Sequence, residues 1–137
     1  MASVSDFFTT YSRASLDNNA GIISKCYAEN FIAAGPSGSM CYKNDEKFLA
    51  WLENMFQVNR KIGMQDMQLI NVTTSPIGEY YTSALVRWSA VYLKSPNDPI
   101  EFEITYILQH LNNNYKIIMY ITHENEEEVL KEKGIIN

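Results

Sequence analysis

Residues 80–94 read Tyr-Tyr-Thr-Ser-Ala-Leu-Val-Arg-Trp-Ser-Ala-Val-Tyr-Leu-Lys and predict a long β-strand. Aromatic and β-branched side chains are frequent in this stretch, and both favour a pleated sheet. Further strands are predicted at 100–111 and 115–122. The three asparagines at 112–114, between these two strands, tolerate the positive φ angles of a tight hairpin turn. Strands that follow one another through short turns indicate an antiparallel sheet.

The alternating pattern begins at Met64, which opens an earlier strand that ends at the turn 75–78, Ser-Pro-Ile-Gly. The segment 95–99, Ser-Pro-Asn-Asp-Pro, is predicted to interrupt the sheet, because proline donates no hydrogen bond to a ladder. The segment 35–39, Gly-Pro-Ser-Gly-Ser, is predicted to be a loop, and a short additional strand is expected near Phe31.

The chain before Met64 has helical periodicity. Ser3 and Asp6 have the spacing of a capping box, and a helix is predicted over about 6–17. A shorter helix follows, and a third begins at Asn44 as its N-cap and ends at Gly63, which suits a helix C-cap. A last short helix is capped by Asn125. Its acidic first turn and basic last turn match the helix dipole, so we expect it to be a surface helix. Helices segregated from strands predict a single α+β domain over residues 1–137.

The composition narrows the possible partners. The chain has 137 residues, 16 acidic and 11 basic side chains, and a formal net charge of −5. This balance is unsuited to neutralising phosphates, so no nucleic-acid partner is expected. No apolar run approaches the ~20 residues that span a bilayer, and the first six residues lack the features of an export signal. We therefore expect no membrane partner and a cytoplasmic location.

The cysteines and histidines do not predict a metal site or a disulfide. In a reducing compartment Cys26 and Cys41 are expected to be free, partly buried thiols. Together with His110 and His123 they lack the close spacing that is typical of zinc ligands. We expect neither a metal nor a cofactor.

Two motifs resemble the nuclear-transport-factor-2-like superfamily, which includes SnoaL-like polyketide cyclases and ketosteroid isomerases. Residues 18–31, Asn-Asn-Ala-Gly-Ile-Ile-Ser-Lys-Cys-Tyr-Ala-Glu-Asn-Phe, are similar to the family's short helix and the start of its first strand. Residues 115–120, Tyr-Lys-Ile-Ile-Met-Tyr, resemble a strand near its C-terminus. The resemblance covers nearly the whole chain. It implies a cone-shaped α+β fold, in which three N-terminal helices pack on a strongly curved antiparallel sheet around a pocket.

An ungapped register against the ketosteroid isomerases compares their functional groups with this chain. The oxyanion-hole tyrosine falls on Tyr11, the catalytic aspartate on Gly35, and the second oxyanion-hole acid on Ile107. A general base needs a titratable group, which Gly35 lacks. Steroid isomerisation by that mechanism is therefore disfavoured, and no catalytic residue is assigned.

The same register predicts which side chains line the cone. The predicted ligand-binding residues are Tyr11, Trp51, Met55, Val86, Trp88, Glu103, Thr105, Ile107 and Tyr120. Glu103 is the only acid that this register places near the cavity. No pairing of Glu103 with Arg87 is expected, because Arg87 alternates away from Trp88 and the predicted inner face.

The strand 100–111 contains a conflict between two kinds of reasoning. The face opposite Glu103 is the more apolar one, with Phe102, Ile104, Tyr106 and Leu108, and amphipathicity alone would pack it beneath the helices. Both patterns can hold if a second subunit covers an apolar outer face, so a homodimer is expected.

Two classes of function remain open. In the first, the chain binds a small, mostly apolar ligand with one acceptor such as a carbonyl, and Tyr11 and Tyr120 are its polar handles. It would do so either as a SnoaL-like enzyme without the isomerase base or as a binding protein. In the second, the chain is a non-catalytic dimeric protein-interaction module that uses the outer sheet face. An open cavity with converging polar groups favours the first class, and a fully packed cone favours the second.

Overall fold

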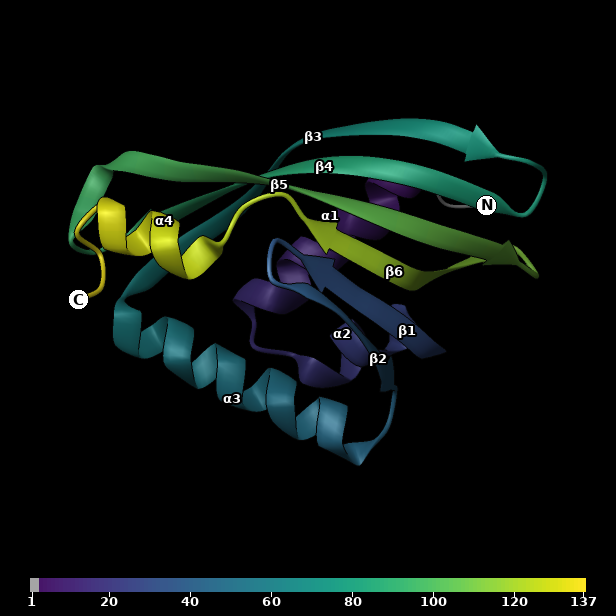
Figure 1. Cartoon of the computed structure of the whole chain (residues 1–137), viewed down its shortest axis with the longest axis horizontal. Coiled ribbons are helices and arrows are strands. Elements are labelled where there is room, and N and C mark those ends of the chain that lie inside the picture. Colours follow the sequence, from purple (N-terminus) through teal and green to yellow (C-terminus); the bar gives the residue numbers. More distant parts are fainter. Residues whose placement is uncertain (1–2) are drawn as a thin grey trace.

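A six-stranded sheet curves around helices in the computed structural model, which describes residues 3–137 (Figure 1). Residues 1 and 2 lie outside the described part. They include the start of the predicted domain and of the segment that was examined for an export signal. The helices are α1 (Val4–Leu16), α2 (Ala20–Lys25), α3 (Glu46–Ile62) and α4 (Glu126–Glu132). The strands are β1 (Tyr27–Gly35), β2 (Gly38–Lys43), β3 (Met64–Ile77), β4 (Tyr81–Tyr92), β5 (Ser95–Leu111) and β6 (Asn114–Thr122). The predicted α+β class is confirmed.

The strand order in the sheet is β2-β1-β6-β5-β4-β3. All neighbouring strands are antiparallel except β1 and β6, which run parallel. Helices α1, α2 and α3 lie on the hollow side of the sheet, and α4 lies between one end of the sheet and α3 (Figure 1). Within residues 3–137 no helix covers the opposite, convex side of the central strands.

Local capping fixes the ends of the helices, and the predicted caps are confirmed with one exception: α3 has Asp45 as its N-cap rather than Asn44, whose amide donates to two backbone carbonyls instead. The Ser3 side chain accepts a hydrogen bond from the Asp6 backbone N–H, and the Asp6 carboxylate accepts one from Ser3 N–H, which completes a capping box. Gly63 ends α3 at φ 93°, a left-handed conformation that favours glycine. Asn112 and Asn113 have φ 53° and 61° and form the predicted β5–β6 turn.

Two proline-containing segments differ from their predictions. Within 35–39 only Pro36 and Ser37 lie outside strands, because the segment is the tight turn of the β1–β2 hairpin. The segment 95–99 does not interrupt the sheet either, since β5 already begins at Ser95. Tyr92 pairs with Ser95 while Ala90 pairs with Ile100, so both prolines lie in a bulge, where a missing N–H is tolerated.

The pairing of β4 with β5 decides which side chains point into the hollow. Trp88 lies opposite Phe102 and Val86 opposite Ile104, so these four share the concave face. Arg87 lies opposite Glu103 on the convex face. Glu103, Thr105 and Ile107 therefore point away from the cone, and the prediction that they line it is wrong. The amphipathic pattern identified the inner face correctly, whereas a register counted without gaps lost its phase, as a one-residue slip reverses every side chain.

Candidate ligand-binding cavity

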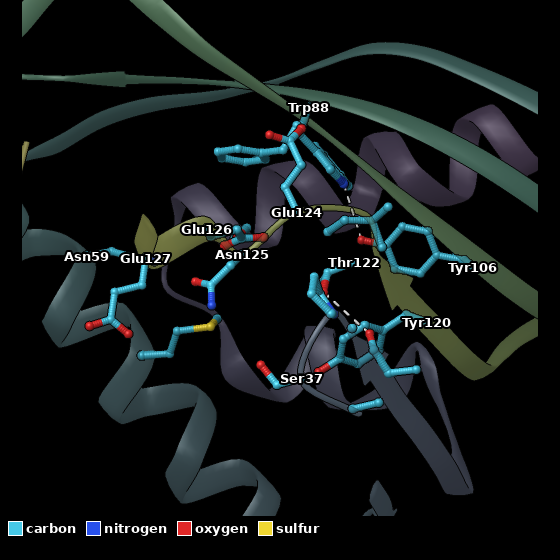
Figure 2. Close-up of a pocket in the computed structure, with 18 of the residues that line it drawn as sticks. Ser37, Asn59, Trp88, Tyr106, Tyr120, Thr122, Glu124, Asn125, Glu126 and Glu127 are labelled. Atoms are coloured by element: carbon cyan, nitrogen blue, oxygen red, sulfur yellow. Dashed lines mark hydrogen bonds between the residues drawn. The ribbon is translucent and has the colours of Figure 1, made fainter. Parts of the chain in front are cut away.

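A cavity of about 680 Å³ occupies the hollow of the sheet. Its walls come from α1, α3, the β1–β2 hairpin, the inner faces of β4, β5 and β6, and the start of α4. Five of the predicted ligand-binding residues line it together: Tyr11, Trp51, Met55, Trp88 and Tyr120. Figure 2 shows Trp88, Tyr106 and Tyr120 on one side of the space and the acidic start of α4 on the other.

The other predicted residues lie elsewhere. Val86 faces the hollow but is fully buried and does not line the cavity. Glu103, on the convex side, forms an ion pair with Arg87, whose Nη2 lies 3.6 Å from Glu103 Oε1. The expectation that these two would not pair is thus wrong, because both belong to the outer face. Thr105 Oγ1 is hydrogen-bonded to His123 Nε2 at 2.7 Å on the same side.

Aromatic hydroxyls form the polar part of the cavity wall. The Tyr11 and Tyr27 hydroxyls are hydrogen-bonded to each other at 2.8 Å, and Trp88 Nε1 donates to Tyr106 Oη at 3.2 Å. Burial raises the pKa of Tyr11, Tyr27 and Tyr106 above the usual value of 10.0. These phenols therefore stay protonated at physiological pH. Two phenols share one hydrogen bond in the Tyr11–Tyr27 pair, so one O–H is left to donate to a bound molecule.

Trp51 forms part of the rim. Its side chain is 51 % exposed, and its ring stacks on Phe48 with the ring centroids 6.2 Å apart. Trp88, at 4 % exposure, belongs to the wall deep inside. The two tryptophans thus offer apolar area at opposite depths of the same cavity.

The sequence reasoning missed the acids at this cavity. Glu124, Glu126 and Glu127 line it, so the prediction that Glu103 is the only acid nearby is wrong. The run 126–128 has a sufficient local explanation, because acidic side chains stabilise the first turn of a helix. Only the folding of α4 across the end of the sheet brings these carboxylates to the cavity.

Glu126 is the acid whose surroundings alter its chemistry. Burial among the cavity walls, and secondly the charge of Glu124, raise the pKa of the Glu126 carboxyl above its ordinary value of 4.5. By its accessible surface Glu126 is nevertheless an exposed residue, so contact with water limits the shift of its pKa.

We expect the Glu126→Gln variant to be slightly more stable than the wild type at pH 7. A carboxyl whose pKa is raised by folding stabilises the native state only when protonated, so its contribution is present below about pH 4.5 and lost as the pH rises through the native pKa. Glutamine stays neutral, and the difference should vanish on acidification. Thermal unfolding at pH 7 and pH 4 measures this effect, and a less stable variant at pH 7 would contradict it.

The position of the isomerase base is occupied by glycine, and a side chain there would require Thr122 to move. The Thr122 hydroxyl occupies the place where a Cβ on Gly35 would begin. Ile107, at the position of the second oxyanion-hole acid, faces outward. Of the three isomerase groups, only the tyrosine has a counterpart in the cavity, Tyr11.

The remaining candidate ligands form no metal centre. Among residues 3–137 no group of three or more His, Cys, Asp or Glu side chains is arranged to hold a metal ion. His110 lies outside the cavity lining and stacks on Tyr115 with the ring centroids 4.9 Å apart. Cys26 is buried, which raises its pKa to about 11, whereas Cys41 is exposed on β2, so partial burial was wrongly expected for it. Within the same described chain, no helix is both long and apolar enough to cross a membrane.

A curved α+β sheet around a helix-lined hollow is the fold of NTF2-like proteins, and comparison with known proteins gives the same class. The family model described as NTF2-like protein (DUF6841) matches residues 2–125, and the chain belongs to this family. The match ends at Asn125, the N-cap of α4, so the whole of α4 follows it. No curated protein matches the sequence.

Solved structures share the fold at low sequence identity. An NTF-2 like protein of unknown function from Shewanella oneidensis MR-1 is 13 % identical with a TM-score of 0.69, and the match covers 88 % of this chain and 96 % of that one. An NTF2-like protein with a cystatin-like fold from Novosphingobium aromaticivorans is 9 % identical with a TM-score of 0.69, covering 96 % and 85 %. A protein of unknown function with a cystatin-like fold from Nostoc punctiforme is 9 % identical with a TM-score of 0.65, covering 89 % and 88 %. At these identities the likeness shows the fold alone.

Proposed function

We propose that this protein binds a small, mostly apolar molecule in the cavity of the cone. The observation that carries the proposal is the cavity of about 680 Å³, in which apolar walls surround a few converging hydroxyls. Its volume falls within the range of about 300–1,000 Å³ that is typical of ligand pockets. The apolar walls supply burial without direction, and Tyr11 and Tyr120 fix the orientation of the ligand.

We further propose that binding occurs without isomerase-type turnover. Proton abstraction beside a carbonyl requires a base within hydrogen-bond reach of that proton. Gly35 supplies no such group, and the Thr122 hydroxyl lies beside it. The carboxylates that line the cavity, Glu124, Glu126 and Glu127, come from the start of α4 and the segment before it rather than from the isomerase position. The buried tyrosines stay protonated, so they donate hydrogen bonds rather than accept protons.

The variant Trp51→Ala is expected to weaken binding of 4-phenylbutan-2-one, an apolar ketone, by about tenfold, since it removes about half of a tryptophan's apolar area from the rim. Trp51 is 51 % exposed, so the free energy of unfolding should fall by no more than about 1 kcal/mol. Isothermal titration calorimetry measures the affinity.

The matched control is Val58→Ala, on the same helix α3 and 44 % exposed but outside the cavity lining. It should bind the ketone as the wild type does. Equal affinities of wild type and Trp51→Ala would contradict the proposed site.

A second function, self-association through the convex face, is supported by a different observation. The homodimer was expected because the apolar face of β5 was assigned to the outside of the cone. That reason does not apply, because Phe102 and Tyr106 face the interior. Another apolar row crosses the convex face: Ile32 lies opposite Met119, which in turn lies opposite Ile107. Helices α1, α2 and α3 lie on the other side of the sheet (Figure 1).

The charges beside this row favour a second copy of the chain as the partner. Arg87 is paired with Glu101 at 3.1 Å as well as with Glu103, so these charges already have partners within the chain. The partner surface that fits this face is therefore apolar rather than charged. A two-fold axis through the row would supply one, because it places the same apolar residues against themselves.

A further inference from the structure

The charged side chains that line the cavity are all of one sign. Glu124, Glu126 and Glu127 line it, and none of the lining residues in the described chain is a lysine, arginine or histidine. Glu127 is partly neutralised by Lys131, whose Nζ lies 3.5 Å from its Oε1. Within residues 3–137 neither Glu124 nor Glu126 forms an ion pair. Two solvent-exposed carboxylates without a neutralising cation thus lie at the edge of the cavity.

The walls opposite these acids are aromatic. Tyr11 lies 5.9 Å from Trp88 and 6.3 Å from Tyr106, measured between ring centroids, and Tyr106 lies 6.4 Å from Tyr120. All four rings line the cavity. The face of an aromatic ring carries partial negative charge and attracts cations, most strongly for tryptophan. Burial keeps the phenols neutral, so these rings favour a cation without carrying a formal charge.

We propose that the ligand of this cavity is an organic cation, in which an amine or quaternary ammonium group is joined to an apolar body. This inference rests on the proposed ligand-binding function and names the chemical class of its ligand. The apolar body lies against Trp88 and the tyrosine rings, and the ammonium group lies beside Glu126. Figure 2 shows Glu126 and Asn125 on the opposite side of the cavity from Tyr106 and Tyr120. A cation there would also relieve the repulsion between Glu126 and Glu124.

The acids at the start of α4 have a second possible role, which the test must separate from the first. Acidic side chains in the first helical turn interact favourably with the helix dipole. Glu126, Glu127 and Glu128 share that role, but Glu128 does not line the cavity. Glu126→Gln and Glu128→Gln therefore form a matched pair, in which the same chemical change in the same helical turn differs only in access to the cavity.

The experiment compares three probes with nearly the same phenylalkyl body: 3-phenylpropylamine, 3-phenylpropan-1-ol and 3-phenylpropanoate. At pH 7 they are cationic, neutral and anionic. We expect the wild type to bind the amine up to about fivefold more tightly than the alcohol, because only the amine forms an ion pair with the exposed carboxylates, and the carboxylate more weakly than both. The preference for the amine should decrease with added salt, because the cavity is open to solvent. Calorimetric titration measures all three affinities.

In Glu126→Gln the amine should bind about as tightly as the alcohol, while the affinity for the alcohol stays at its wild-type value and shows that the cavity is intact. Glu128→Gln should keep the full preference for the amine. The inference is overturned if the wild type binds the alcohol or the carboxylate as tightly as the amine, or if Glu126→Gln keeps the preference. If none of the three probes binds at millimolar concentration, the proposed function itself fails. Binding of the alcohol without preference for the amine rejects the cation alone.

Discussion

Replacing Trp88 with alanine is expected to lower the free energy of unfolding by about 3–5 kcal/mol, the usual cost of truncating a buried tryptophan. Trp88 is 4 % exposed and contacts the rings of Phe8 and Tyr11, with centroids at 6.4 and 5.9 Å. Its Nε1 also donates to the hydroxyl of Tyr106, which is itself 3 % exposed. The variant removes the ring contacts and this donor together, and a buried hydroxyl without a partner adds to the cost.

Urea denaturation followed by circular dichroism measures this loss. The control is Trp51→Ala, the same chemical change at a side chain that is 51 % exposed, with an expected loss of no more than about 1 kcal/mol. Similar losses in the two variants would mean that Trp88 is not held as the structure describes. In the described part of the wild-type chain every buried side-chain N or O atom has a hydrogen-bond partner. Trp88→Ala would leave the Tyr106 hydroxyl without the donor that it has in the wild type.

The features predicted correctly from the sequence are those that a few neighbouring residues determine. Ser3 and Asp6 close a capping box, Gly63 adopts the left-handed conformation, and Asn112 and Asn113 form the hairpin turn. In each case the side chain acts on backbone groups within about four residues, so no knowledge of the tertiary structure is needed.

The face of β5 was predicted wrongly because its phase depends on distant irregularities. The β4–β5 ladder is irregular between Ala90 and Tyr92, where residues 96–99 of β5 face Val91 alone. A comparison without gaps does not register such an insertion, and an odd number of extra residues reverses the alternation. The apolar spacing of Phe102, Ile104 and Tyr106 predicted the inner face of β5 correctly. Apolar side chains face the core whatever insertions precede them in the sequence.

The acidic edge of the cavity could not have been predicted from local sequence. Glu126 follows a good N-cap, Asn125, and the helix dipole accounts fully for its position in the chain. Its role at the cavity depends on how α4 packs across the end of the sheet. Such a long-range contact leaves no periodic pattern in the sequence, and the family match also ends at residue 125.

The variant Ile107→Lys is expected to raise the dissociation constant of the proposed homodimer by at least about 100-fold. Ile107 on β5 ends the convex apolar row, next to Met119 on β6 and opposite Ser83 on β4. In a two-fold dimer the substitution occurs twice, so two ammonium groups would be forced into one apolar contact. Desolvating an unpaired charge costs several kcal/mol, and every ~1.4 kcal/mol changes the dissociation constant tenfold.

Sedimentation velocity over a range of protein concentrations measures the association, and the folded monomer should be retained because Ile107 is only half-buried. The control is Leu93→Lys, which introduces the same charge at an apolar side chain that is 66 % exposed but lies in the β4–β5 turn, outside the row. This control should associate as the wild type does.

A wild-type protein that sediments only as a 15.7 kDa monomer at micromolar concentration would reject the dimer. If the Ile107→Lys dimer has the same dissociation constant as the wild type, the dimer contact does not include this apolar row. Neither result would affect the cavity, because the row and the cavity lie on opposite faces of the same strands and their side chains alternate between them.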